Sequence, residues 1–294
     1  MMIAGRQVRF VSLCFSCLLI VRLAVSLLFA SDHVVDDRVV YATFVDDNED
    51  YFVGAQVLAC SLRRAGVMAP LLLLVPRDRP AVVAHLRATV HWARVIDVPA
   101  IPPPPSADSD GRFARTWSKL NVWALDSDEW DRIVFIDADC VVLTSRVHEL
   151  EQHTRHLPAF ASDSYPQDTL NSGVIVLRPD LGDYLALRAR MTDAPPHWRS
   201  EQDLLNDYFG PRWFGSARML PSHLNWHAWQ SVSDPSRAAL VRPSVLHFSG
   251  VHKPWRQRAG GAPRAWHEVM RLWHVCAEQC RVDLIRDPTL LLVG

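Results

Sequence analysis

Long apolar runs alternate with amphipathic segments through most of the chain. Uninterrupted runs such as LLLLV at 71–75 and IVFI at 133–136 are typical of strands that are covered on both faces. The strands that these runs predict are 39–45, 71–75, 93–98, 133–136, 173–177 and 244–248. The helices that the spacing predicts are 53–64, 81–90, 117–125, 181–191, 202–209 and 265–277. This alternation favours a single α/β domain with a mostly parallel central sheet and helices on both faces.

An apolar segment, residues 1–30, precedes the predicted domain, and a polar linker at 31–38 separates the two. Its apolar run is long enough for a membrane helix, which needs about 20 residues, although Arg22 lies in its middle. Two interpretations stay open: an uncleaved signal anchor, which forms an N-terminal apolar helix, or a signal peptide that is cleaved near Ala30. The anchor predicts a single-pass type II protein of the Golgi or ER membrane with a lumenal domain, and cleavage predicts secretion.

The predicted domain extends over 39–280, and an apolar C-terminal tail at 281–294 follows it. Six cysteines in a chain of this length do not indicate a disulfide framework. Cys276 and Cys280 lie one helical turn apart, where a mutual disulfide would be strained. The sequence therefore leaves packing or separate partners open for these two cysteines.

The charge of the chain bears on whether a nucleic acid is a partner. A formal net charge of -1 gives no electrostatic reason to expect a nucleic acid. Of the 31 basic residues only Lys119 and Lys253 are lysines, and arginine fills the other positions. These two positions either need a compact ammonium group in place of a planar guanidinium or kept lysine by chance. Composition alone does not choose between the two explanations.

Two carboxylates follow the apolar strand at 133–136, where a buried strand normally carries none. Residues i and i+2 of an extended chain project to the same side, so Asp137 and Asp139 can bind one cation. Carboxylate oxygens suit Mn²⁺ or Mg²⁺, and burying both charges without a partner costs on the order of several kcal/mol. With 25 aspartates, about two such triplets arise by chance. The other two, at 108–110 and 126–128, lie in polar surroundings that indicate solvated loops.

Six motifs between residues 41 and 255 occur in the order that is found in one family. They are YATFVDDNEDYFVGAQVLACSL from residue 41, WSKLNVW from 117, FIDADCVVL from 135, LNSGVIVL from 170, SEQDLLN from 200 and VLHFSGVHKPW from 245. Together they resemble glycosyltransferase family 8, the glycogenin group of retaining sugar-nucleotide transferases. The resemblance implies a Rossmann-like domain of the GT-A type that binds a UDP-sugar at the carboxyl edge of its sheet.

The reaction that the resemblance implies is metal-dependent, retaining transfer of a hexosyl or hexuronosyl group to a glycan or glycolipid hydroxyl in the secretory pathway. UDP-glucose, UDP-glucuronate and UDP-galactose stay open as donors, and the sequence determines neither the acceptor nor the oligomeric state. The implied metal is Mn²⁺, with Mg²⁺ as the alternative, and its implied ligands are Asp137, Asp139 and His247. A histidine at a strand end is more often structural, but the SGVHKPW motif around it reverses that expectation.

The other site residues are also implied by the resemblance. Lys119 and Lys253 would face the phosphates, so both lysines of the chain fall on lysine positions of the family. Gly250 would let the backbone approach the diphosphate. The residues implied in catalysis are Gln202, beside the anomeric carbon, Glu201 and Lys119. The residues implied in donor binding are Thr43, Tyr51, Lys119, Ala138, Asp163, Asn171, Gly250 and Lys253.

Within the donor site, the resemblance gives separate roles to the sugar and nucleoside contacts. Asn171 and Asp163 would bind hydroxyls of the sugar, whereas Thr43 and Tyr51 would line the uracil and ribose pocket. Packing between helix and sheet is the alternative explanation for the tyrosine, and an ordinary strand position is the alternative for the threonine. Ala138 has no polar side chain, but its backbone could bond to the ribose.

Two features depart from the glycogenin pattern. Glu201 stands where the family usually has aspartate, and the extra methylene moves the carboxylate by about one bond, which puts its role in holding the sugar in question. No tyrosine follows Tyr208, so the self-glucosylation of glycogenin is not expected. The apolar N-terminal segment and the motifs from residues 41 and 117 are more similar to plant-type glucuronosyltransferases that act on xylan or inositol phosphorylceramide.

Two other classes of function compete with the transferase. A non-catalytic lumenal domain that binds a nucleotide-sugar or glycan is favoured only by Glu201. A metal-dependent nucleotidyltransferase would share the acidic strand, but the sequence has no Gly-rich basic triphosphate loop after its first strand. The combined motifs therefore favour the transferase.

Overall fold

The computed structural model of the chain describes residues 38–46, 50–77, 92–107, 113–163, 168–256 and 263–280. The predicted N-terminal segment at 1–30, the helix at 81–90 and the tail at 281–294 lie outside the described residues. Among the residues that the structure describes, no helix is both long and apolar enough to span a membrane.

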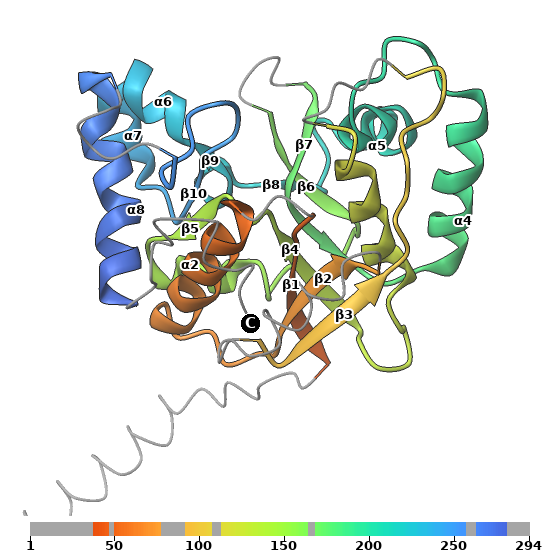
Figure 1. The fold of residues 1–294 in the computed structure, drawn as a ribbon, viewed down its shortest axis with the longest axis horizontal. Helices are drawn as coiled ribbons and strands as arrows, with labels where there is room; N and C mark the ends of the chain where they lie inside the picture. Colours follow the sequence, from red (N-terminus) through yellow and green to blue (C-terminus); the bar gives the residue numbers. More distant parts are fainter. Residues whose placement is uncertain are drawn as a thin grey trace, which may run out of the picture. The chain divides into compact units, whose positions relative to one another are not determined.

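A seven-stranded sheet forms the centre of the fold, in the order β3-β2-β1-β4-β7-β6-β8 (Figure 1). Its strands are β1 (Val39–Phe44), β2 (Leu71–Pro76), β3 (Arg94–Val98), β4 (Arg132–Ile136), β6 (Ala159–Ser162), β7 (Leu170–Leu177) and β8 (Met219–Leu220). The neighbours β3, β2, β1 and β4 are parallel, whereas β7 runs antiparallel to both β4 and β6. The prediction of an α/β fold with a mostly parallel sheet is confirmed.

Apolar residues on both faces of β1 give the sheet two cores. Val40 packs in one core with residues of α4 (Leu181–Arg190) and α5 (Glu201–Phe209). Tyr41 packs in the other core with residues of α2 (Asp50–Arg64). Successive residues of a strand point to opposite faces, so one buried strand contributes to both cores. The expectation of helices on both faces is confirmed.

The segment that was expected as an ordinary helix at 117–125 is a 3₁₀ helix, η1 (Thr116–Ala124). Trp117, Leu120 and Trp123 recur every third residue, and all three are fully buried in the first core. A 3₁₀ helix has three residues per turn, so this spacing places the three side chains in one row. The spacing of the large apolar residues therefore explains the tighter helix.

A second, three-stranded sheet consists of β5 (Cys140–Val142), β10 (Val245–His247) and β9 (Trp226–His227). β10 pairs antiparallel with β5, so His247 lies opposite Cys140. The sequence predicted only β10 of these strands, because two or three residues are too few to show an alternation. This small sheet brings the histidine next to the carboxylates that precede β5.

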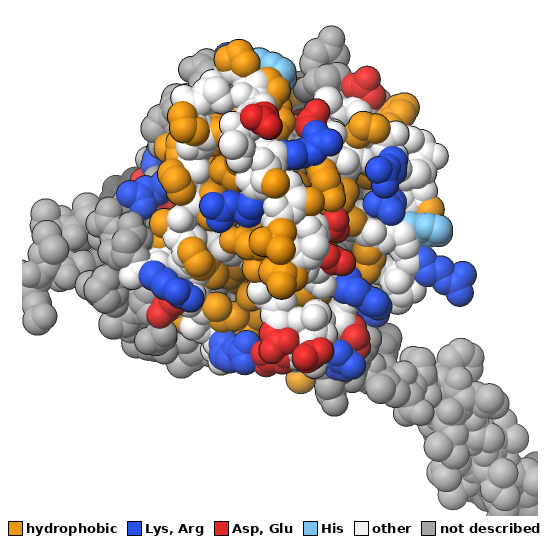
Figure 2. All heavy atoms as spheres, turned by 90° about the vertical axis from the view of Figure 1, so that its right-hand side faces the viewer, with side chains coloured by type: hydrophobic (Ala, Val, Ile, Leu, Met, Phe, Trp, Pro, Cys, Tyr) orange, Lys and Arg blue, Asp and Glu red, His pale blue; other side chains and the backbone are white. Residues whose placement is uncertain are grey.

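Short helices complete the fold. The helices of the C-terminal part are α6 (Ala228–Ser233), α7 (Pro235–Val241) and α8 (His267–Gln279), of which the sequence predicted α8. The remaining 3₁₀ helices are η2 (Ser145–Glu149), η3 (Met191–Asp193), η4 (Gly210–Arg212), η5 (Ser222–Leu224) and η6 (Arg264–Trp266). Figure 2 shows the side on which α4 and α5 lie in Figure 1, and apolar side chains are interspersed there with basic and acidic ones. Leu181 and Leu185 give α4 an exposed apolar edge.

A disulfide joins α2 to the end of α8, because Cys60 pairs with Cys280, which lies 220 residues later in the sequence. Cys276 is free and buried, and its Sγ atom lies 3.9 Å from the Sγ atom of Cys280. The sequence left packing and separate partners open for the last two cysteines. The structure gives Cys280 a separate partner and places Cys276 in the packing of α8.

Replacing Cys280 by serine is expected to lower the free energy of unfolding by about 3–5 kcal/mol, because the disulfide closes a long loop in the unfolded chain. Urea unfolding of the oxidised protein, followed by circular dichroism, measures this difference. Cys276→Ser is the matched control, since it changes a neighbouring buried cysteine on the same helix and leaves the disulfide intact. Equal unfolding midpoints for Cys280→Ser and the unchanged chain would contradict the assigned disulfide.

Candidate functional site

The candidate site lies at the carboxyl end of β4, where β7 begins. β7 is antiparallel to β4, and its residue Val174 pairs with Ile136, the last residue of β4. The backbone N–H of Asp137 then donates to the carbonyl oxygen of Gly173 at 2.8 Å. The antiparallel direction therefore brings the start of β7, which carries Asn171, to the edge at which Asp137 leaves the sheet.

Each of the two predicted carboxylates forms an ion pair with one of the two lysines of the chain. Lys119 Nζ lies 2.9 and 3.0 Å from the two carboxylate oxygens of Asp137. Lys253 Nζ contacts a carboxylate oxygen of Asp139 and donates to the carbonyl oxygen of Phe248 at 2.6 Å. The lysines are 7% and 4% exposed. The Lys253–Asp139 pair is therefore almost completely removed from water, whereas the Asp137 side chain keeps 20% of its surface exposed.

Burial and the neighbouring charges act against each other on the pKa values of these groups. Burial lowers the pKa of Lys253, but Asp139 raises it further, and the net pKa lies above that of an ordinary lysine. Burial raises the pKa of Asp139, but Lys253 and His247 lower it to a net value below the usual range. For Asp137, burial outweighs the effect of its lysine, and the pKa lies above the usual range.

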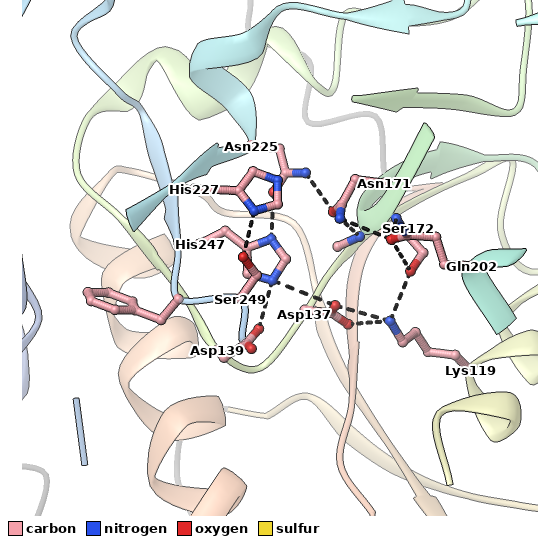
Figure 3. Close-up of polar contacts among 12 residues, drawn as sticks. Lys119, Asp137, Asp139, Asn171, Ser172, Gln202, Asn225, His227, His247 and Ser249 are labelled. Carbon is pink, nitrogen blue, oxygen red and sulfur yellow. Dashed lines mark hydrogen bonds and ion pairs between the residues drawn. The ribbon is translucent and has the colours of Figure 1, made fainter. Parts of the chain in front are cut away.

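His247 reaches the same carboxylates from β10. Its Nε2 atom lies 3.2 Å from Asp139 Oδ1 and 4.0 Å from Asp137 Oδ2, as Figure 3 shows. Asp139 Oδ1 is buried and has no hydrogen-bond partner among the described residues. His247 thus lies near both predicted carboxylates, and the buried Asp139 Oδ1 atom fits a cation at this point, whereas the set of all three as ligands of one ion stays a prediction. An imidazole beside carboxylates suits Mn²⁺ better than a purely hard ion.

Cys140 lies in the same cluster, and the sequence did not single it out. One ligand atom each of Asp139, Cys140 and His247 lies within 4.8 Å of the others. Burial, followed by the two neighbouring carboxylates, raises the pKa of the Cys140 thiol well above its ordinary value. The protonated thiol is a poor ligand for a hard ion, because the thiolate is the form that binds metals.

The residues that the sequence assigned to the donor sugar also lie together. Gln202 Nε2 donates to Asp163 Oδ2 at 2.9 Å. Asn171 Nδ2 donates to Gln202 Oε1 at 3.0 Å, and Figure 3 shows these two side chains. The backbone N–H of Ser172 donates to the same Gln202 oxygen at 3.1 Å. The carbonyl oxygen of this amide is therefore held by β7, and its nitrogen faces Asp163.

The start of α5 has a local cause in the sequence SEQD. Ser200 and Asp203 form a capping box, in which each side chain accepts a hydrogen bond from the backbone N–H of the other residue. This cap fixes the first turn, so Gln202 and Glu201 project from a defined position at the helix N-terminus. The motif thus combines a structural cap with two site residues.

Glu201 forms an ion pair with Lys119 in the structure. Its Oε1 atom is 2.8 Å from Lys119 Nζ and 2.9 Å from Ser172 Oγ, and the residue is only 2% exposed. Lys119 is therefore held between the carboxylates of Asp137 and Glu201. The extra methylene relative to aspartate extends the carboxylate towards this ammonium group.

The structure describes the four remaining residues that were predicted for donor binding, Thr43, Tyr51, Ala138 and Gly250. Thr43 is buried in β1, and its hydroxyl has no hydrogen-bond partner among the described residues. The ring of Tyr51 lies under Lys253 Nζ, at 5.4 Å from the ring centroid. Gly250 has a φ of +87°, a conformation that glycine adopts readily, and a Cβ there would meet nothing within 4 Å. Ala138 is buried. The roles of these four residues in donor binding stay predictions.

Gly54 of α2 lets the loop that contains Asp137 and Asp139 pack closely against this helix. A Cβ atom at this position would lie 2.5 Å from the carbonyl oxygen of Ala138. The close approach is open only to glycine, and it directs that carbonyl towards α2. The loop between the two carboxylates is thus packed against the helix that begins near Tyr51.

Two site residues, His227 and Asn225, could not be found from the sequence. His227 stacks on His247, with ring centroids 5.1 Å apart, and its Nδ1 atom lies 2.5 Å from Ser249 Oγ. Burial, followed by the neighbouring His247, lowers the pKa of His227 to about 4, so its ring is neutral near pH 7. Asn225 Oδ1 lies 2.9 Å from His247 Nδ1. Asn225 precedes the two-residue strand β9 and His227 is its second residue, and no motif marks either of them.

Two cavities lie on either side of Asp163. One has a volume of about 330 Å³, and its lining includes Ser162, Asp163, Pro221, Asn225, Trp226, Gln230 and Arg237. The other has a volume of about 460 Å³, and its lining includes Asp163, Thr169, Trp198, Gln202, Asp203 and Asn206. Of the predicted sugar residues, Asp163 therefore borders both cavities and Gln202 borders the second.

The chain is similar in sequence to several sugar transferases. It is 27% identical over 242 residues to galactinol synthase 1 of Solanum lycopersicum, a match that covers 74% of this chain and 73% of the relative. It is 30% identical over 223 residues to glycogenin-1 of Caenorhabditis elegans, covering 72% and 50%. It is 28% identical over 231 residues to UDP-glucuronate:xylan alpha-glucuronosyltransferase 2 of Arabidopsis thaliana, covering 74% and 36%. No protein-family profile matches the chain.

Solved structures with a similar fold are also sugar transferases. The galactosyltransferase LgtC, solved with donor and acceptor sugar analogs, superposes with a TM-score of 0.56 at 19% identity, covering 80% of this chain and 95% of that one. The glycosyltransferase GlyE of Streptococcus pneumoniae TIGR4 superposes with a TM-score of 0.52 at 16% identity, covering 82% and 62%. The resemblance that the motifs predicted and the fold of the GT-A type are confirmed by these comparisons.

Proposed function

Because this chain is a glycosyltransferase with the GT-A fold, homologous to glycogenin and galactinol synthase of family 8, we propose that it uses a UDP-sugar donor and a divalent metal ion. It transfers a hexosyl or hexuronosyl group, with retention, to a hydroxyl of a glycan or glycolipid. The observation that carries this proposal is that His247 lies near both Asp137 and Asp139, and that each of these carboxylates forms an ion pair with a buried lysine. A diphosphate that is bound through a metal needs this combination of ligands and counter-charges.

The metal would be held by Asp137, Asp139 and His247, and Mn²⁺ suits this set, with Mg²⁺ as the alternative. The buried Asp139 Oδ1 atom, which lacks a hydrogen-bond donor among the described residues, supports this assignment. When bound, the ion supplies Lewis-acid stabilisation of the leaving diphosphate.

Lys119 and Lys253 would bind the phosphate oxygens of the donor. Both are held by carboxylates in the structure, so each needs only to exchange one anionic partner for another. Glu201 keeps a contact with the Lys119 ammonium group during this exchange, because its buried carboxylate lies 2.8 Å from Nζ independently of Asp137. A buried ammonium that is positioned in this way stabilises negative charge as it develops on the leaving group.

Gln202, Asn171 and Asp163 would orient the donor sugar. The Gln202 oxygen is occupied by the Ser172 backbone and by Asn171, so the amide nitrogen is the group that can contact the sugar. The carboxylate of Asp163 borders both cavities, and an acceptor hydroxyl that enters from either would meet it next to Gln202. This arrangement supports transfer to a second substrate.

The proposal includes action in the secretory pathway, at the Golgi or ER membrane through the N-terminal segment or in secreted form. The Cys60–Cys280 disulfide supports an oxidising compartment, because cytosolic thiols are normally kept reduced. The apolar run within residues 1–30 supports entry into that compartment.

UDP release from a panel of UDP-glucose, UDP-glucuronate and UDP-galactose tests the proposal with the full-length protein in detergent. We expect release from at least one donor in Mn²⁺, loss of release in excess EDTA, and recovery when Mn²⁺ is added back. Asp139→Asn, which keeps the size and removes the charge, should bind the metal poorly and release little UDP. Turnover that survives excess EDTA would overturn the metal assignment, and donor binding without any turnover would favour the non-catalytic alternative.

A further inference from the structure

We infer that Asn225 is a positioning residue whose side-chain oxygen sets the tautomer of His247 and so makes its Nε2 atom available to the metal. Asn225 is 2% exposed and lies between η5 and β9. Its amide joins His247 on one side to Asn171 on the other, as Figure 3 shows. The inference rests on the proposed metal site and adds a residue to which none of the motifs gives a role.

The orientation of the Asn225 amide follows from a backbone group that cannot reverse. The N–H of Gly173 donates to Asn171 Oδ1 at 2.9 Å, and a backbone N–H can only donate. The oxygen of the Asn171 amide is thereby identified. The Asn225 atom that lies 2.8 Å from that oxygen must be the donor Nδ2, so the atom that faces His247 is the oxygen Oδ1.

The proton of a neutral His247 ring therefore lies on Nδ1, which donates to Asn225 Oδ1 at 2.9 Å. Nε2 then carries a lone pair, and it faces Asp139 Oδ1 at 3.2 Å. Two acceptors at this separation repel each other unless a cation lies between them. With the other tautomer, an Nε2–H group would donate to the carboxylate and occupy the position that the metal needs.

The His247 ring is also confined by its neighbours. His227 stacks on it with an interplanar angle of 29°. A Cβ atom on Gly173 would lie 2.3 Å from His247 Cε1, so β7 passes directly against the ring. These contacts restrict the plane of the ring, whereas Asn225 determines which nitrogen is protonated within that plane. Partners of this kind fix ring orientation and tautomer at histidine ligands generally.

Mn²⁺ binding to the donor-free, full-length protein, measured by isothermal titration calorimetry, tests the inference. Asn225→Ala removes the acceptor and should weaken Mn²⁺ binding about 10–100-fold. Asn225→Asp keeps an acceptor for Nδ1–H and should bind Mn²⁺ within a few-fold of the unchanged chain. A purely structural role predicts the opposite order, because aspartate also places a buried charge against the Asn171 oxygen.

Asn121→Ala is the matched control, because Asn121 is another buried asparagine that donates two hydrogen bonds, to Pro99 and Ser118. It should lower the melting temperature without changing the Mn²⁺ dissociation constant. Equal Mn²⁺ affinity in Asn225→Ala and the unchanged chain would overturn the inference and leave the proposed function standing.

Nitrogen-15 spectra of the metal-free protein, at a pH where the imidazole is neutral, give a second measurement that does not depend on metal binding. The expected spectrum has the His247 proton on Nδ1 in the unchanged chain and in Asn225→Asp, and a mixture of tautomers in Asn225→Ala. A proton on Nε2 in the unchanged chain would overturn the inference. If the unchanged chain failed to bind Mn²⁺, the proposed metal site would be overturned instead. The nitrogen-15 spectra would still show which nitrogen of His247 carries the proton.

Discussion

Lys253→Arg is expected to lower the rate of sugar transfer by on the order of 100-fold, although the substitution keeps the charge. The ammonium group is buried between the Asp139 carboxylate, the Phe248 carbonyl and the Tyr51 ring. A planar guanidinium is larger and cannot occupy this position without displacing the diphosphate. Misplacing a reacting group by about 1 Å can cost that much in rate. Steady-state kinetics with the preferred donor measures the effect.

Arg94→Lys is the control for this substitution, since Arg94 forms an exposed ion pair with Glu129. Exposed pairs of this kind contribute on the order of 0–1 kcal/mol, so transfer should change less than about twofold. Circular dichroism spectra of both variants show whether a fall in rate comes from unfolding or from a local change at the site. Transfer at the unchanged rate in Lys253→Arg would show that Lys253 does not contact the donor.

Gly173→Ala is expected to abolish most activity, by on the order of 100-fold or more, through the metal ligand that lies against it. The added Cβ would lie 2.3 Å from Cε1 and 2.6 Å from Nδ1 of His247. β7 is hydrogen-bonded to strands on both sides, so the histidine ring must move instead of the backbone. A displacement of about 1 Å is enough for a loss of this size. Transfer rate and Mn²⁺ affinity should therefore fall together.

Gly210→Ala is the matched control for the added methyl group. A Cβ at Gly210 would meet its nearest neighbour, the side chain of Asn206, only at 3.8 Å. That is ordinary van der Waals contact, and transfer should stay within about twofold of the unchanged rate. If Gly173→Ala and Gly210→Ala had equal Mn²⁺ affinities, the close packing of β7 on His247 would not govern the metal site.

Long elements and compact motifs could be predicted from the sequence, because each carries its signal within a few neighbouring residues. The run at 71–75 became β2, and the acidic triplet that follows 133–136 leaves the sheet at its carboxyl edge. Lys119 was marked by its motif and by its rarity. Asp137 and Glu201 were marked as well, but their pairing with Lys119 was not, because they meet it only after β4, η1 and α5 have packed.

The features that the sequence did not reveal depend on contacts between distant segments. Cys60 lies 220 residues before Cys280, and nothing in the helix that contains it marks it as a partner. Asn225 precedes and His227 ends a strand of two residues, which is too short to show a periodicity. Their importance follows from the ring of His247, which β10 places beside them. Sequence patterns describe local periodicity, whereas these pairings are set by tertiary packing.

The pairing of lysines with carboxylates has a consequence for electroneutrality. Asp137, Asp139 and Glu201 face the two ammonium groups, which leaves one net negative charge at a largely buried site. In the proposed reaction, the two charges of a divalent ion cancel those of the UDP-sugar diphosphate. For a donor whose only charges lie on the diphosphate, the complex of ion and donor leaves the net charge at -1, whereas the ion alone makes it +1 and the donor alone makes it -3. Donor binding without the ion is therefore the unfavourable combination, because it alone increases the magnitude of the buried net charge.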